Sequence, residues 1–247
     1  MASAATYESH GVRLSYRRIG SGPPLVLIHG WSANGDEWSE VGWPDALPGR
    51  TLLIPDLRGH GLSAKPRDPA AYTMEAFAAD IVALLNAVDA PAADVFGYSM
   101  GGTVALWTAT LEPGRVQSLI AGGVADAQDG DAAGLARALR GVDPPTSRSE
   151  RYRAYIERVG NNDMEALLAC LDAGIRAPSC PELAVFGGEA LLASGDGDRR
   201  HETTERLAAC LPGGRFLSLA GADHMGGFED GRFKEAAATF LDEVSPR

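Results

Sequence analysis

The sequence of 247 residues predicts an α/β fold: a doubly wound, mostly parallel sheet into which one helical segment is inserted. The runs "PPLVLIHG" and "TLLIPDLRGHG" are continuously apolar, which is typical of parallel strands covered on both faces. Segments with helical spacing alternate with strand-like runs along most of the chain. Residues 125–182 depart from this alternation, so we expect them to form the insertion.

The segments before the insertion are assigned in chain order. Residues 7–22, "YESHGVRLSYRRIGSG", space apolar residues with polar ones between glycines and predict a β-hairpin. Residues 73–90 carry apolar side chains at helical spacing, and Thr73 is a suitable residue to begin that helix. A second helix, "TVALWTATLEPGRV", should stop at its Pro-Gly pair, and "VQSLIAGGV" predicts a further strand.

The insertion itself is predicted to be helical. Three helix-like pieces, separated by "DPPTS" and "NN", follow the small and polar stretch "ADAQDGDAAG". The sheet resumes near Leu183 with the strands "EALLASG" and "GRFLSLAG", between which "ETTERLAACL" is a helix. An amphipathic helix, "RFKEAAATFLDEV", closes the chain. The predicted core therefore comprises residues 1–124 and 183–247, with the helical insertion at 125–182.

The charge balance bears on the partners of the protein. Acidic residues outnumber basic ones by 33 to 22, and the formal net charge is −11. This repulsive field argues against nucleic acids and anionic membranes and leaves a small-molecule substrate as the expected partner. The sequence has no signal-peptide pattern, membrane-length apolar stretch or metal-ligand cluster. We therefore expect a cytoplasmic protein that needs no metal or organic cofactor, and the oligomeric state is left open.

The cysteines lead to the same expectation about location. Cys170, Cys180 and Cys210 are odd in number and include no C-x-x-C pair. This pattern predicts neither a disulfide framework nor a zinc site. We expect reduced thiols that pack as small apolar residues, as in a cytosolic protein, with a Cys170–Cys180 bridge as the alternative.

One serine stands between glycines at the end of a predicted strand, in "ADVFGYSMGG". A strand that turns at once into a helix forces its central residue, Ser99, into a strained conformation that exposes the hydroxyl. Gly97 and Gly101 suit the close passage of strand and helix. The N–H of Met100 would lie at a helix N-terminus, which favours an anion. The pattern therefore predicts a nucleophile, although a glycine-rich turn with an incidental serine is the simpler interpretation.

Five segments, taken in order, resemble the α/β-hydrolase family of serine esterases with a small helical cap. They are "LVLIHGWSANGDEW", "IPDLRGHGLS", "FGYSMGG", "LLASGDGD" and "LAGADHM". The resemblance covers most of residues 10–124 and 185–245 and implies a Ser, acid, His order of catalytic residues. It also places the insertion where that family has its variable cap.

A base is needed because a serine hydroxyl attacks only as its proton is removed. Among five histidines, His224 satisfies the implied chain order, and its flanking glycines suggest a mobile loop over the sheet edge. His10 and His201 are expected at the surface. His29 and His60 lie in glycine-flanked loops, where the resemblance favours structural hydrogen bonds to backbone carbonyls.

The acid should follow a strand between Ser99 and His224. The resemblance to the family's Gly-x-x-Asp selects Asp198, whose role would be to hold the imidazole tautomer and offset its charge. Asp196 and Asp126 remain alternatives, and Asp223 is expected to be solvated.

The oxyanion hole needs two donors aimed where negative charge develops. One is the backbone N–H of Met100, and the resemblance implies the backbone N–H of Trp31 as the second. Candidate substrate-binding residues are Trp31, Tyr152, Tyr155 and Met225. The two tyrosines are more simply core residues of the insertion, together with Ile156, Met164 and Leu168.

These residues predict a serine hydrolase that cleaves a small carboxylic ester through an acyl-enzyme. A serine at the turn argues against the aspartate-nucleophile branches, the haloalkane dehalogenases and epoxide hydrolases. The alternatives are a thioesterase or C–C bond hydrolase on the same triad, and a hydrolase-like small-molecule receptor with little turnover. Arg151, Arg153 or Arg158 could meet a substrate carboxylate, although a solvated helix face is the simpler interpretation.

Overall fold

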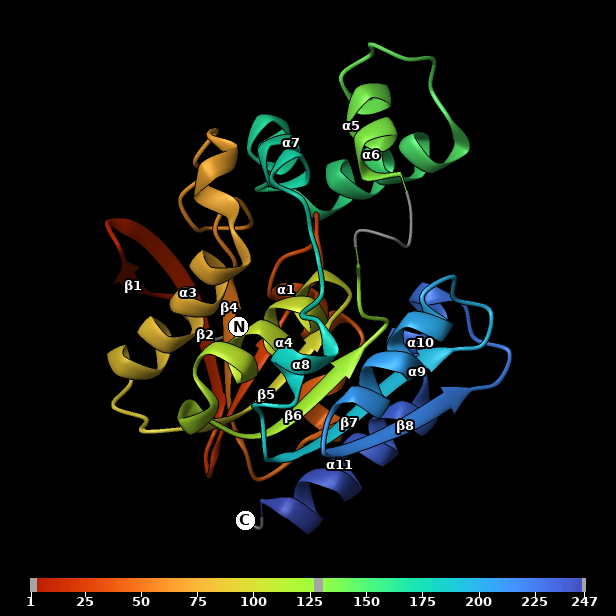
Figure 1. Cartoon of the computed structure of the whole chain (residues 1–247). Coiled ribbons are helices and arrows are strands. Elements are labelled where there is room, and N and C mark those ends of the chain that lie inside the picture. The colour runs from red at the N-terminus through yellow and green to blue at the C-terminus, as the bar shows by residue number, and fades with distance from the viewer. Residues whose placement is uncertain (1–3, 127–130, 246–247) are drawn as a thin grey trace.

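The computed structural model describes residues 4–126 and 131–245, in which one eight-stranded sheet lies between helices (Figure 1). The strand order is β1-β2-β4-β3-β5-β6-β7-β8. The predicted hairpin, β1 (Ala5–Ser9) and β2 (Val12–Gly20), is antiparallel and forms one edge. The remaining strands are mutually parallel, as predicted. They are β3 (Pro24–Ile28), β4 (Thr51–Asp56), β5 (Ala93–Tyr98), β6 (Val116–Gly122), β7 (Glu189–Gly195) and β8 (Gly213–Leu219).

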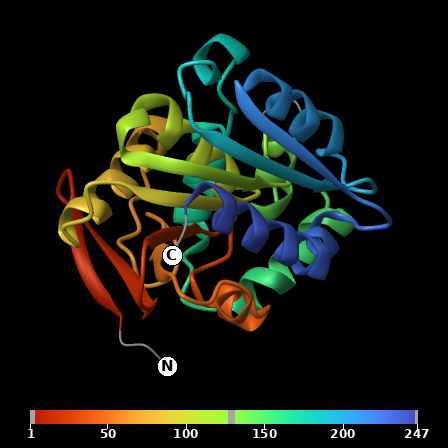
Figure 2. The ribbon, with the colours of Figure 1, turned by 90° about the horizontal axis from the view of Figure 1, so that it is seen from below.

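Helices cover both faces of the sheet because successive strand residues point to opposite sides. Val26 and Val95 pack into one core cluster, and their neighbours Leu25 and Phe96 pack into the other. Figure 2 shows α11 on the opposite side of the strands from α4 and α9. One side carries α3 (Met74–Ala87), α4 (Met100–Leu111) and α9 (His201–Cys210), and the other carries α1 (Asp36–Glu40), α2 (Trp43–Ala46) and α11 (Gly231–Val244).

Local signals in the sequence set the helix ends. The Thr73 hydroxyl accepts a hydrogen bond from the N–H of Ala76 at 3.1 Å, which satisfies one of the free donors at the start of α3. The second helix, α4, ends at Leu111, just before Pro113, because proline cannot continue the i→i−4 hydrogen bonds. Both observations confirm the predicted boundaries.

The segment between β6 and β7 is helical, and Figure 1 shows α5, α6 and α7 above the sheet. Thr146 and Asp163 accept hydrogen bonds at the starts of α6 and α7. Leu135, Ile156 and Leu167 are buried, so the three helices share apolar contacts. Residues 127–130 of the predicted polar stretch lie outside the described residues. The helices are α5 (Ala132–Leu139), α6 (Ser147–Val159) and α7 (Met164–Ala173), and a short α8 (Cys180–Leu183) follows them.

The loop expected at His224 is a short helix instead, so that prediction was wrong. The residues His224–Glu229 form α10, and the Asp223 carboxylate accepts a hydrogen bond from the N–H of Gly226 at 2.7 Å. Asp223 is exposed, as predicted, and its carboxylate also caps this helix. Glycine lowers helix propensity, but contacts of α10 with the sheet outweigh that preference in so short a helix. Phe228, on the same helix, is buried among aromatic side chains.

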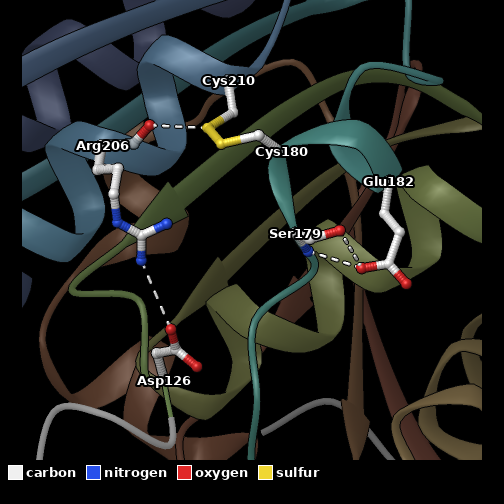
Figure 3. Close-up of a disulfide and its surroundings, with 6 residues drawn as sticks. All are labelled: Asp126, Ser179, Cys180, Glu182, Arg206 and Cys210. Carbon is white, nitrogen blue, oxygen red and sulfur yellow. Dashed lines mark hydrogen bonds and ion pairs between the residues drawn. A yellow bond between two sulfur atoms is a disulfide. The ribbon is translucent and has the colours of Figure 1, made fainter.

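The expectation of three reduced thiols was wrong. Cys180 and Cys210 form a disulfide with a Cα–Cα separation of 4.8 Å (Figure 3). Cys170 is a buried free thiol. The alternative Cys170–Cys180 bridge is excluded as well. Spacing along the chain could not show this pair, because α8 and α9 meet only through folding of the sheet. The bond also removes the argument from reduced thiols for a cytosolic location.

Both ends of the helical segment are attached to α9. At its start, the Asp126 carboxylate lies 3.6 Å from the Arg206 guanidinium, an ion pair drawn in Figure 3. The same carboxylate accepts a hydrogen bond from the N–H of Ala177, at the end of the segment, at 3.2 Å. The disulfide then joins Cys180 of α8 to Cys210 of α9. The position of α5–α7 is therefore coupled to the helix that follows β7.

Within residues 4–126 and 131–245, no helix combines the length and the apolar character that crossing a bilayer requires.

The disulfide should stabilise the fold measurably. It closes a loop with a sequence separation of 30, and removing it should lower the free energy of unfolding by about 2–4 kcal/mol, because the unfolded chain regains entropy. Urea denaturation of protein purified without reductant, repeated with dithiothreitol, measures this. The double variant Cys180→Ser/Cys210→Ser is the control and should not respond to dithiothreitol. An intact mass showing three free thiols before reduction would contradict the bond.

Candidate active site

Four of the predicted site residues follow parallel strands and lie at the carboxyl edge of the sheet, where α/β proteins bind their ligands. Trp31 lies beyond β3, Ser99 directly follows β5, Asp198 follows β7 and His224 follows β8. In the sheet, β3, β5, β6, β7 and β8 are neighbours in that order. The fold thus brings together residues that are up to two hundred positions apart in the chain.

The turn between β5 and α4 has the backbone that the sequence predicts. Ser99 has φ 57° and ψ −121°, in the region that side chains other than glycine rarely adopt. The residues two positions before and two positions after Ser99 must be glycines, because the backbone segments pack too closely for a side chain. A Cβ on Gly97 would lie 2.0 Å from the Gly101 oxygen, and a Cβ on Gly101 would lie 2.1 Å from the Ile28 oxygen. The strained serine is held because β5, α4 and β3 touch through backbone alone.

Asp198 and His224 are in direct contact. The Nδ1 atom of His224 lies 2.6 Å from Oδ2 of Asp198, and the Asp198 side chain is 1% exposed. The other carboxylate oxygen of Asp198 accepts a hydrogen bond from the N–H of Arg200 at 3.1 Å. An ionised aspartate at this position requires a proton on Nδ1, which leaves Nε2 free to accept one.

The electrostatics of the pair favour a neutral imidazole. Burial lowers the pKa of His224; the hydrogen bond to Asp198 opposes this shift, and the charges of Arg200 and Arg199 reinforce it. Burial by itself would raise the pKa of Asp198, but the hydrogen bond and charge of His224, with help from Arg200, hold it below its ordinary value. At neutral pH the pair is therefore a carboxylate next to an uncharged base.

Neighbouring residues fix the position of His224. The Tyr98 hydroxyl donates a hydrogen bond to the His224 carbonyl oxygen at 2.6 Å. Gly123, with φ +48°, lies under the ring, where a Cβ would come within 2.9 Å of its Cε1 atom and 3.2 Å of Asp198 Oδ2. The space that the acid–base pair occupies therefore depends on a glycine at the end of β6. Neither Gly123 nor Tyr98 was predicted from the sequence to support this site.

The other histidines have structural surroundings. Leu57 donates its N–H to Nε2 of His29 at 3.0 Å, so Nδ1 of that ring donates to the Gly30 oxygen at 2.8 Å. His60 donates from Nδ1 to the Arg58 oxygen at 2.9 Å, and burial with repulsion from His29 lowers its pKa to about 3. His10 is exposed, and the half-buried His201 contacts the Gly195 oxygen at 3.0 Å from the start of α9.

The alternative acids lie elsewhere. Asp196 is exposed and accepts a hydrogen bond from the N–H of Gly221 at 2.8 Å. Asp126 binds the N–H of Ala177 and pairs with Arg206 at the base of the helical segment. The carboxylate in contact with the His224 ring is that of Asp198.

A cavity of about 450 Å³ opens beside Ser99 and His224. The four candidate substrate-binding residues all line it: Trp31, Tyr152, Tyr155 and Met225. The rings of Trp31 and Tyr152 pack edge to face with 5.0 Å between their centroids. By contrast, Ile156 and Leu168 are buried in the core of the helical segment. Helix α6 therefore presents its tyrosines to the cavity.

Two backbone segments that could bind an oxyanion flank Ser99. Met100 is the first residue of α4, so its N–H has no partner within the helix. On the other side Gly30 precedes Trp31, and a Cβ on Gly30 would lie 3.3 Å from the Ser99 Cβ. The Trp31 indole is held by a hydrogen bond to the Leu167 oxygen at 3.1 Å, which ties this loop to α7.

Four charged residues that line the cavity were not singled out from the sequence: Glu37, Arg148, Arg199 and Arg200. Arg148 could have been predicted from the sequence, because its spacing from Tyr152 and Tyr155 places all three on one helix face. Glu37 and the Arg199–Arg200 pair reach the cavity through tertiary contacts alone. Within the described ranges, no cluster of three or more His, Cys, Asp or Glu side chains is arranged to hold a metal ion.

A family model described as the alpha/beta hydrolase fold matches residues 23–144. That match includes the Gly30–Trp31 loop and the Ser99 turn. The chain belongs to the α/β-hydrolase fold family. The resemblance inferred from the five sequence segments is confirmed at this level.

Two curated relatives each match less than half of this chain, and the match spans less than half of their own length. An uncharacterised protein of Mycobacterium tuberculosis is 42% identical over 119 residues, which are 47% of this chain and 34% of that protein. A non-heme chloroperoxidase of Streptomyces lividans is 36% identical over 115 residues, 45% of this chain and 41% of the relative. Other similar proteins are named as a 2-hydroxymuconate semialdehyde hydrolase and a soluble epoxide hydrolase.

Solved structures match nearly the whole α/β-hydrolase chain. A hydrolase from Pseudomonas aeruginosa has a TM-score of 0.82 and 24% identity, and the match covers 97% of this chain and 98% of that one. An esterase from Exiguobacterium antarcticum also matches, with a TM-score of 0.81 and 20% identity over 97% and 100% of the two chains. At these identities the likeness shows the fold.

Gly101→Ala should destabilise this α/β-hydrolase. The added Cβ would lie 2.1 Å and 2.6 Å from the backbone oxygens of Ile28 and His29, so strand and helix must separate. We expect a loss of about 1–3 kcal/mol in the free energy of unfolding, measured by urea denaturation. Gly114→Ala is the matched control because a Cβ there meets nothing within 4 Å. Equal effects of the two substitutions would argue against the close contact.

Proposed function

We propose that this protein is a serine hydrolase that cleaves small carboxylic esters through an acyl-enzyme. The observation that carries the proposal is the 2.6 Å contact between His224 and Asp198 at the cavity that Ser99 also lines. An oriented neutral imidazole and a half-buried, strained serine that line one cavity are the groups that nucleophilic acyl transfer requires. In this proposal Ser99 is the nucleophile, His224 is the base and Asp198 is the acid.

The first step is attack on the ester carbonyl. The Ser99 oxygen bonds to the carbonyl carbon while His224 Nε2 takes the hydroxyl proton. The ring becomes an imidazolium, and the Asp198 carboxylate at Nδ1 stabilises that charge without taking the proton. The lowered pKa of His224 keeps the ring uncharged, and thus able to accept a proton, throughout the neutral range.

The carbonyl oxygen becomes negative in this step, and two backbone donors are proposed to stabilise it. They are the N–H groups of Met100 and Trp31, which flank Ser99. A donor of this kind contributes about 3–4 kcal/mol to transition-state stabilisation in enzymes of this type. Collapse of the tetrahedral intermediate breaks the bond to the alcohol oxygen, which receives the proton from His224.

Water completes the cycle. It attacks the acyl-enzyme carbonyl as His224 removes one of its protons. When the second tetrahedral intermediate collapses, the bond between the acyl carbon and the Ser99 oxygen breaks, and His224 returns the proton to that oxygen. The products are a carboxylic acid, an alcohol and the free enzyme. A cavity of about 450 Å³ is large enough for a small ester.

A C–C bond hydrolase or thioesterase on the same residues is the second candidate. The observation that favours the C–C reaction is 33% identity over 112 residues to a 2-hydroxymuconate semialdehyde hydrolase. A panel of nitrophenyl esters, acyl-thioesters and vinylogous diketones separates these activities. Comparable or greater kcat/KM on either of the last two classes would reject the plain esterase. The epoxide hydrolase branch is disfavoured by serine at the nucleophile position.

Ser99 should react with a fluorophosphonate probe. The activated hydroxyl attacks phosphorus as it would a carbonyl carbon, so the wild-type protein is labelled on Ser99 and loses esterase activity in proportion. Peptide mass spectrometry locates the label. Ser99→Ala should remain folded by circular dichroism and take up no label. A folded wild-type protein that resists the probe would support the receptor alternative instead.

Asp198→Asn should lower kcat/KM on a nitrophenyl ester by about 10³- to 10⁴-fold, because an amide cannot hold the productive tautomer or offset the imidazolium charge. Asp196→Asn is the matched control, since Asp196 is exposed and its carboxylate accepts a hydrogen bond from the backbone N–H of Gly221. It should leave kcat/KM within about 2-fold of wild type, because this carboxylate binds the Gly221 backbone, whereas Asp198 binds the His224 ring. The reverse order of effects would transfer the role of acid to Asp196.

A further inference from the structure

One face of α6 is turned toward the cavity, and two of its four lining residues are arginines. Arg148, Arg151, Tyr152 and Tyr155 occupy positions i, i+3, i+4 and i+7 of the helix. Residues at this spacing lie on a single helix face. The other arginines of the helix point elsewhere: Arg153 donates to the Leu139 oxygen, and Arg158 pairs with Glu40.

Two more arginines reach the cavity from the segment between β7 and α9. Arg199 and Arg200 directly follow Asp198, and both line the cavity. Arg200 is 8% exposed, and its Nε atom is buried with no hydrogen-bond partner among the described residues. Partial desolvation lowers the pKa of Arg199, and repulsion from Arg200 and Arg148 lowers it further, which shows that these cations share one region.

The cavity arginines are poorly neutralised. In the part of the chain that the structure describes, Arg148, Arg151 and Arg199 form no ion pair with a carboxylate. Arg148 donates a hydrogen bond to the Asp131 carbonyl oxygen and lies over the Tyr152 ring. Arg200 lies 3.7 Å from Asp198, a carboxylate already bonded to His224. Like charges gathered without counter-ions cost free energy, and a bound anion would offset that cost.

The carboxyl groups of the cavity are already engaged. Tyr155 donates its hydroxyl to Glu37, and burial raises the pKa of that carboxyl group. Asp223 caps α10, and Asp198 holds His224. Four guanidinium and three carboxyl groups line the cavity, which leaves an excess of one positive charge. The whole chain has a formal net charge of −11, so this local excess opposes the overall balance.

We propose that the ester cleaved at this site carries a carboxylate, which Arg148, Arg151 and Arg199 bind in the cavity. This inference rests on the proposed esterase function and names its substrate class. Guanidinium groups bind carboxylates through paired N–H···O bonds, and one excess positive charge matches a carboxylate better than a phosphate dianion. The negative chain as a whole would repel such a substrate, so the arginines also supply the local attraction that draws it to Ser99.

The test compares charged esters with neutral esters of the same shape. One pair is mono-4-nitrophenyl adipate and 4-nitrophenyl 6-methylheptanoate, with the charge on the acyl side. The other is 4-acetoxybenzoate and 4-isopropylphenyl acetate, with the charge on the leaving group. For at least one pair, the wild-type kcat/KM should favour the charged ester, and the ratio should fall at high salt because the arginines are partly exposed.

The variants are Arg148→Gln/Arg151→Gln/Arg199→Gln and the control Arg153→Gln. Arg200 is left unchanged because it contacts Asp198. The triple variant should lose about 10- to 100-fold of the charged-to-neutral ratio. Because Arg199 also acts on the pKa of His224, the neutral ester measured with the same variant corrects for any change in the basal rate. Arg153→Gln changes the charge of the same helix outside the cavity and should keep the wild-type ratio. Circular dichroism and thermal melts establish that each variant is folded.

Binding without turnover separates this inference from the proposed function. Adipate should bind Ser99→Ala by isothermal titration calorimetry, and adding the three arginine substitutions should weaken it by about 10-fold or more. Neutral esters hydrolysed in preference to both charged esters would overturn the inference and leave the esterase standing. So would an equal loss of the ratio in Arg153→Gln. If the protein binds adipate but cleaves no ester, the result would support the proposed carboxylate-binding site and contradict the proposed esterase function.

Discussion

The site depends on one steric constraint, the backbone contact between β5, α4 and β3. Gly97 and Gly101 have no side chain, so strand and helix approach within a distance that any Cβ would block. This contact leaves Ser99 at positive φ with no easier conformation available, and the packed sheet stabilises the strain. The same contact sets Met100 at the start of α4 and brings Gly30 against Ser99. The position of Ser99 and the positions of the backbone N–H groups proposed to bind an oxyanion therefore have a common origin.

A second glycine-dependent contact supports the acid–base pair. Gly123 follows β6, the strand between those that precede Ser99 and Asp198, and its missing side chain makes room for the His224 ring. Tyr98, one residue before Ser99, holds the His224 backbone. Residues at the ends of β5 and β6 thus help to position Asp198, which follows β7, and His224, which follows β8. Movement of any one strand relative to its neighbours would disturb the whole set, which is why the rigid sheet rather than the loops determines the geometry.

The helical segment between β6 and β7 is linked to the same elements. Asp126, Ala177 and the Cys180–Cys210 bond attach both of its ends to α9, and the residues just before α9 include Asp198 and Arg200. Trp31 adds a hydrogen bond from the loop after β3 to α7. Helix α6, which carries Arg148 and Arg151, is consequently held in a fixed position relative to His224 and Asp198. A charged substrate bound by that helix would be oriented relative to Ser99 without a large movement of the fold.

Much of the architecture could be predicted from the sequence alone, because periodicity and helix-capping are local properties. Continuous apolar runs predicted the parallel strands, Thr73 predicted the start of α3, and the glycine-flanked serine predicted a strained turn. Tertiary structure alone decided the Cys180–Cys210 pairing, the short helix at His224, the glycine beneath its ring and the gathering of Arg199 and Arg200 with α6. Each of these joins segments that are distant in the chain, and their proximity follows from strand order and close packing, which no local pattern encodes.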